Sequence, residues 1–179
     1  PEFLLNNLVL ALNLAGEISI DDAVAGFGGI LASYPHSPDR HLLTSNCAAF
    51  EILRGDVASA LRRLNKASDE IGAVESFDQY YRYFVNTNLA VAVFHSGDVT
   101  SAKQLWEQAA ADIAAIDEKS RAYHDRRHQL LAGAFDIVEP GEVSRWNGYL
   151  LENHPKEVGD TWPLYAHGVA FTTIEHWET

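Results

Sequence analysis

A short triplet of glycine, an acidic residue and a branched aliphatic residue occurs four times in this chain and constrains its fold more than any other feature. The glycines are 39, 42 and 44 residues apart, in Gly16-Glu17-Ile18, Gly55-Asp56-Val57, Gly97-Asp98-Val99 and Gly141-Glu142-Val143. An Asn precedes three of these glycines by nine residues, and an Ala follows two of them by five and again by twelve residues. Agreement at several offsets indicates an internal repeat.

Each triplet predicts a tight turn between two helices. Glycine adopts the left-handed conformation that commonly ends a helix, and the acid after it can accept backbone N–H bonds at the start of the next helix. Around Gly97, apolar residues recur at three- and four-residue spacing from Tyr81 to His95 and again from Val99 to Ile113. This stretch predicts a helical hairpin, and the repeat predicts four of them.

We therefore expect one all-α domain over residues 4–179. The four helix pairs fall at about 4–34, 40–71, 80–113 and 122–154, and a further helix over 161–177 would cover the end of the array. In the first pair the second helix is expected to start late, capped by Asp21 or Asp22. Residues 1–3 resemble a vector remnant, and because the chain contains no Met, we expect it to be part of a larger protein.

Charge and composition exclude several classes of partner. The net charge of -12 argues against a nucleic-acid surface, because phosphate binding requires a basic face. No apolar run approaches the ~20 residues that span a bilayer. The single cysteine, Cys47, lies on an apolar helical face, which predicts a core residue in a reducing compartment such as the cytoplasm.

The chain offers little that resembles a catalytic or metal site. His124 and His128 are one helical turn apart, which is the spacing of a pair of zinc ligands, but no third ligand is identifiable and Arg126 and Arg127 would oppose a cation. We expect a solvated, partly basic helix face there, with no metal and no other cofactor. Cys47 has no identified His partner, so we expect no enzymatic activity from this chain.

Two stretches carry a resemblance to a known family. The pattern Asn-x8-Gly-Asp-x4-Ala-x6-Ala, found at Asn46–Ala67 and Asn88–Ala109, resembles the tetratricopeptide repeat. The resemblance covers roughly residues 4–154, and the spacing exceeds the usual 34 residues of that repeat, as in long-period forms from bacterial signalling regulators. The proline that commonly closes each repeat is missing. The resemblance implies a right-handed superhelix in which the first helix of each pair lines a concave groove.

That resemblance also implies which residues line the groove. No Lys or Arg occurs from 42 to 53 or from 84 to 95, so we expect an apolar groove that takes a peptide or a helix and does not clamp a terminal carboxylate. Two roles are open for the asparagines, which can bond the backbone of a ligand or bond within the array. The expected groove residues are Asn46, Ala49, Ile52, Leu53, Asn88, Val91, Phe94 and His95.

The leading functional hypothesis is a protein–protein interaction scaffold or regulatory domain of a larger protein. It would bind a peptide or a neighbouring domain through the concave groove. One alternative is a regulatory domain that senses a small molecule in a pocket between the repeats. The other is a structural arm through which the parent protein self-associates.

Overall fold

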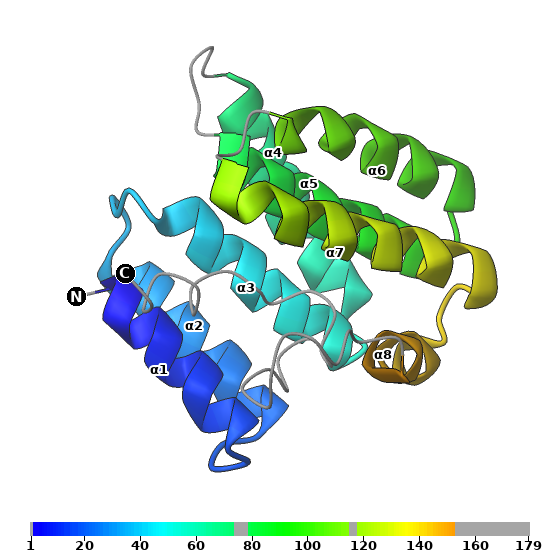
Figure 1. Cartoon of the computed structure of the whole chain (residues 1–179). Coiled ribbons are helices and arrows are strands. Elements are labelled where there is room, and N and C mark those ends of the chain that lie inside the picture. Colours follow the sequence, from blue (N-terminus) through cyan, green and yellow to red (C-terminus); the bar gives the residue numbers. More distant parts are fainter. Residues whose placement is uncertain (1, 74–78, 115–117, 153–179) are drawn as a thin grey trace.

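The computed structural model describes residues 2–73, 79–114 and 118–152 of the chain, and these form eight α-helices without a strand (Figure 1). Successive helices pair across the four predicted turns. The helices are α1 (Glu2–Leu14), α2 (Ile20–Ser33), α3 (Arg40–Leu53), α4 (Val57–Gly72), α5 (Gln79–His95), α6 (Val99–Ile113), α7 (Glu118–Ile137) and α8 (Val143–Glu152).

The turn within each pair is made by the repeated glycine. Gly16, Gly55, Gly97 and Gly141 have φ of 73°, 85°, 102° and 88°, and they are the residues with positive φ in the described ranges. Left-handed backbone is strained for residues that carry a Cβ atom, so these four positions favour glycine. The predicted turn is confirmed at all four repeats.

Acidic residues cap the second helix in the two central pairs. The carboxylate of Asp56 accepts the backbone N–H of Ser59 at 3.1 Å, and that of Asp98 accepts the N–H of Ser101 at 3.0 Å. These bonds satisfy donors that the first turn of a helix leaves free. Hydrogen bonds from the side chain and backbone of Ser59 lower the pKa of Asp56, and those from the backbone and side chain of Ser101 lower the pKa of Asp98. The predicted acidic caps are confirmed at these two positions.

In the first pair, the second helix is capped in a different way. Helix α2 starts late, as expected, but its N-cap is Ser19 and not Asp21 or Asp22. The Ser19 hydroxyl accepts the N–H of Asp22 at 3.1 Å, and the Asp22 carboxylate accepts the N–H of Ser19 at 3.1 Å. This reciprocal arrangement is a capping box.

Helices α3 and α5 form the centre of the bundle. Helix α3 packs against α2, α4, α5 and α8, while α5 packs against α3, α4 and α6; α1 lies beside α2 at one end (Figure 1). Every residue from Leu42 to Ile52 is buried, so most of α3 is covered by neighbouring elements. A helix in that environment contacts neighbours around its whole circumference.

Small side chains stand where paired helices meet. The repeated alanines are at most 2% exposed, as expected for positions at which helices approach closely. They are Ala60, Ala67, Ala102 and Ala109.

The expected helix over 161–177 lies outside the described residues. Within the described ranges, no helix combines the length and the apolar character needed to cross a membrane.

Candidate interaction surfaces

The side chains expected to line a groove lie in the core. Seven of them are 0–7% exposed, and Leu53 beside them is half-buried. An open groove of the expected kind is therefore absent at these positions. A ligand role for them stays a prediction. Such a role would require the elements that cover these side chains to move away. The seven buried residues are Asn46, Ala49, Ile52, Asn88, Val91, Phe94 and His95.

Side chains from the fourth pair cover the end of α5. The Phe94 ring packs against Phe135 of α7 and Trp146 of α8, with ring centroids 5.2 and 5.3 Å apart. The Nδ1 atom of His95 accepts the backbone N–H of Gly141 at 3.3 Å. Burial lowers the pKa of His95 to about 4. Side chains and backbone of the last helix pair thus cover Phe94 and His95.

A buried set of amides joins the first helices of successive pairs. The Nδ2 atom of Asn46 donates to the Oδ1 atom of Asn6 at 2.8 Å. The Nδ2 atom of Asn88 donates to the Oγ atom of Ser45 at 2.7 Å and to its backbone oxygen at 3.2 Å. Arg127 donates to the Oδ1 atom of Asn88 at 3.5 Å. Of the two roles left open for these asparagines, the structure shows the bonds within the array.

The face that carries the histidine pair is buried, so the expectation of a solvated face is wrong. His124, Arg127 and His128 are 0%, 3% and 8% exposed. The His128 ring stacks on Trp106 with centroids 4.2 Å apart, and the Arg127 guanidinium lies over the Tyr83 ring. Burial and the Arg127 charge lower the pKa of His128 to about 4. The aromatic partners lie on other helices, α5 and α6, so the local pattern of α7 did not reveal them.

Cys47 is a core residue, as predicted. It is fully buried, and burial raises the pKa of its thiol to about 11. A thiol in that state is protonated near neutral pH and is a poor nucleophile. In the described part of the chain, no three His, Cys, Asp or Glu side chains are grouped as a metal site would require.

Helix α1 carries an exposed apolar face. Leu4, Leu5 and Leu8 are 59%, 36% and 51% exposed. Ala11 and Ala15 are also exposed and continue the line of Leu4 and Leu8 at helical spacing. No charged residue occurs from position 3 to position 15. We call the surface formed by Leu4, Leu5, Leu8, Ala11 and Ala15 the α1 face.

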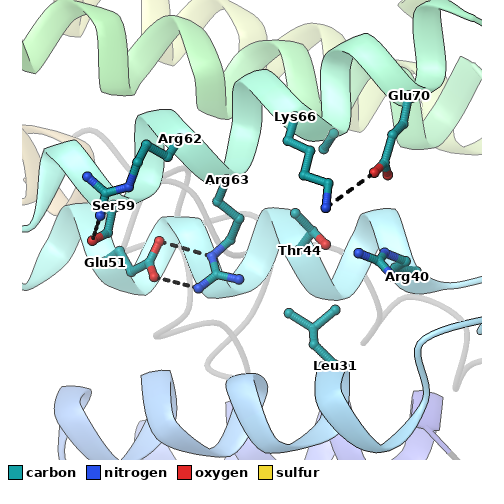
Figure 2. A pocket seen from close by; sticks show the side chains of 10 residues that line it. Leu31, Arg40, Thr44, Glu51, Ser59, Arg62, Arg63, Lys66 and Glu70 are labelled. Carbon is teal, nitrogen blue, oxygen red and sulfur yellow. Dashed lines mark hydrogen bonds and ion pairs between the residues drawn. The ribbon is translucent and has the colours of Figure 1, made fainter.

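A second surface feature is a pocket of about 330 Å³ lined by residues of α2, α3 and α4 (Figure 2). Sequence reasoning considered basic residues only on the first helix of each pair and therefore missed it. The signal was present in α4, where Arg62, Arg63 and Lys66 lie within five residues. We call this the cationic pocket; its lining is Leu31, Arg40, Thr44, Glu51, Ser59, Arg62, Arg63, Lys66, Ala67 and Glu70.

Neither surface can be interpreted through a relative, because no protein-family model, curated protein or solved structure matches this chain.

Proposed function

We propose that this chain is a tetratricopeptide-repeat-like superhelical array that serves as a protein-interaction module of a larger protein. Its left-handed glycines and acidic caps support the repeat. The observation that carries the function is the α1 face. The proposal includes no catalytic step, and the single reduced cysteine, Cys47, favours a cytoplasmic setting.

The α1 face differs from the surface that usually ends a helical array. Terminal repeats need a polar outer face to remain soluble, whereas α1 presents Leu4 and Leu8 on a helix that lacks charge after Glu2. Burying each leucine against a partner is worth about 1.5–3 kcal/mol. A contiguous apolar patch of this kind marks a docking surface more often than a solvated one.

The chemistry of the face favours a helix as the element that covers it. Ala11 and Ala15 are small and lie in line with Leu8, so a second helix can approach closely there. Ala60 and Ala102 perform this role between helices inside the bundle. We propose that an apolar helix of a neighbouring domain or partner protein packs along α1, and that the contact depends little on salt.

The proposal can be tested with a photo-crosslinking amino acid placed at Leu8 in the full protein inside its own cells. The matched control places it at Ile137, the other large apolar side chain with high exposure in the described residues, at 52%. We expect one discrete crosslinked product from position 8 and none of that mass from position 137. Peptide mapping should locate the crosslink on a helix with an apolar face.

Two further outcomes separate this proposal from its alternatives. A position-8 product that maps to a second copy of this chain would support the structural arm that self-associates. Identical products from positions 8 and 137, or no product from either, would contradict docking on the α1 face.

A further inference from the structure

We propose that the cationic pocket binds a short acidic segment of a protein partner, at a site separate from the α1 face. The pocket concentrates positive charge on an acidic protein. Four of the thirteen Lys and Arg residues of the chain line it, against two of its twenty-five Asp and Glu residues. Its charge is therefore opposite in sign to the net charge of -12 of the whole chain.

One ion pair forms the fixed wall of the pocket. The Nε and Nη2 atoms of Arg63 donate to the two carboxylate oxygens of Glu51 at 3.1 and 2.8 Å (Figure 2). The Glu51 side chain is 4% exposed. A two-bond geometry of this kind fixes the guanidinium plane. The charge of Arg63 is thus neutralised and its side chain is held in place. The uncompensated positive charge of the pocket must come from the other basic side chains that line it.

Arg62, next to Arg63 in the chain, and Lys66, one turn further along α4, supply part of that charge. Arg62 donates to the Ser59 hydroxyl at 2.8 Å and makes no ion pair in the described ranges. The Nζ atom of Lys66 lies 3.8 Å from a carboxylate oxygen of Glu70, and the Lys66 side chain is 69% exposed. An exposed pair at that separation is weak, so an incoming anion can compete for the ammonium group.

Arg40 supplies the rest from the start of α3. Its Nη1 atom donates to the backbone oxygen of Pro35 at 2.8 Å, and among the described residues it has no carboxylate partner. The first turn of α3 contains no acidic residue. The N-cap of α3 is Asp39, whose carboxylate offsets the positive partial charge of the helix start, so the Arg40 guanidinium alone adds positive charge at this end of the pocket. Repulsion between the positive side chains of the pocket destabilises the free protein, and a bound anion relieves this repulsion.

The ligand class follows from charge and size. Guanidinium groups bind carboxylates through paired N–H bonds, and Leu31 and Ala67 add apolar contact in the same pocket. A long polyanion would meet repulsion from the acidic remainder of the chain. A volume of about 330 Å³ is at the small end of ligand pockets. A few acidic side chains on a short peptide segment fit these limits.

The test is fluorescence anisotropy of the full chain with a labelled octapeptide of alternating Glu and Ala, at about 50 mM salt. The Gln-for-Glu peptide is the ligand control. We expect saturable binding of the Glu peptide only, weakened about tenfold by Arg62→Gln and by Lys66→Gln. Arg145→Gln is the protein control, because Arg145 is 57% exposed, pairs with Glu142 and is not among the residues that line the cationic pocket; it should leave binding unchanged.

The result that would overturn the proposal is absence of Glu-peptide binding, or binding that Arg62→Gln leaves unaltered while circular dichroism shows a folded chain. Equal binding of the Gln peptide would also overturn it. Inorganic phosphate that binds more tightly than the peptide would replace the peptide class by small phosphorylated ligands. None of these outcomes depends on crosslinking at Leu8, so this inference and the docking of α1 can fail independently.

Discussion

The Nδ2 atom of Asn46 lies 2.8 Å from the Oδ1 atom of Asn6, and both side chains are buried although forty residues separate them. This bond joins α3 to α1 directly, across a boundary between repeats. A buried amide that lost its partner would retain its cost of desolvation. The pair therefore holds α1, the helix that carries the α1 face, against α3.

We expect Asn46→Ala to lower the free energy of unfolding by about 1–3 kcal/mol, because it removes the bond to Asn6 and leaves space in the core. Urea denaturation measures the change. Asn65→Ala is the matched control, since Asn65 is exposed on α4, and it should change stability by no more than about 0.5 kcal/mol. Equal effects of the two substitutions would show that the amide bond is not structural.

We expect Ala60→Leu to destabilise the chain by about 1–3 kcal/mol through overpacking. Ala60 is fully buried, whereas Ala58 two residues earlier on α4 is exposed. Ala58→Leu should therefore leave the thermal midpoint nearly unchanged. If Ala60→Leu also melted at the wild-type temperature, the repeated alanines would not be the sites of close helix contact.

We expect Gly97→Ala to cost about 1–2 kcal/mol, because Gly97 has φ of 102° and alanine is strained in that region. Gly72 gives the matched control. It ends α4 with helical geometry and has open space where a Cβ atom would stand, so Gly72→Ala should be neutral or stabilising. Chemical denaturation of both variants would measure the change in the free energy of unfolding. An equal loss of stability in both variants would argue against a left-handed requirement at Gly97.

The stability of the chain should fall as the pH drops from about 6.5 to about 4. Burial holds the pKa of His95 and His128 at about 4 in the folded state, below the ~6.5 of a free histidine. Between these values the unfolded chain binds more protons, so acid favours unfolding. His128→Phe should remove part of this slope. Urea midpoints measured at several pH values would show it, and an unaltered slope would mean that His128 is not buried as a neutral group.

Local patterns predicted the elements of the fold well. The helix expected from Val99 to Ile113 has these bounds in the structure, and its start is set by the Gly97 turn and the Asp98 cap, which act within a few residues. The start of α5 was less accurate, with Gln79 in place of about Tyr81, because apolar periodicity marks the middle of a helix better than its first turn.

The burial of the expected groove residues could not be predicted in the same way. At Phe94 it depends on Phe135 and Trp146, whose contacts with Phe94 join residues more than forty positions apart. The His128–Trp106 stack likewise joins different repeats. A family resemblance supplies an expected open surface, but it carries no information on how the last helix pair of a particular chain packs against the others.

The affinity of the partner captured at position 8 tests docking on the α1 face most directly. Isothermal titration would measure the Kd of this partner for the wild-type chain, Leu8→Glu and Ile137→Glu. Leu8 and Ile137 are apolar side chains of similar size and are 51% and 52% exposed. Loss of about 1.5–3 kcal/mol of apolar contact corresponds to a 10- to 100-fold weaker Kd for Leu8→Glu, while Ile137→Glu should bind like the wild type. Equal affinity of the wild type and Leu8→Glu would contradict the account.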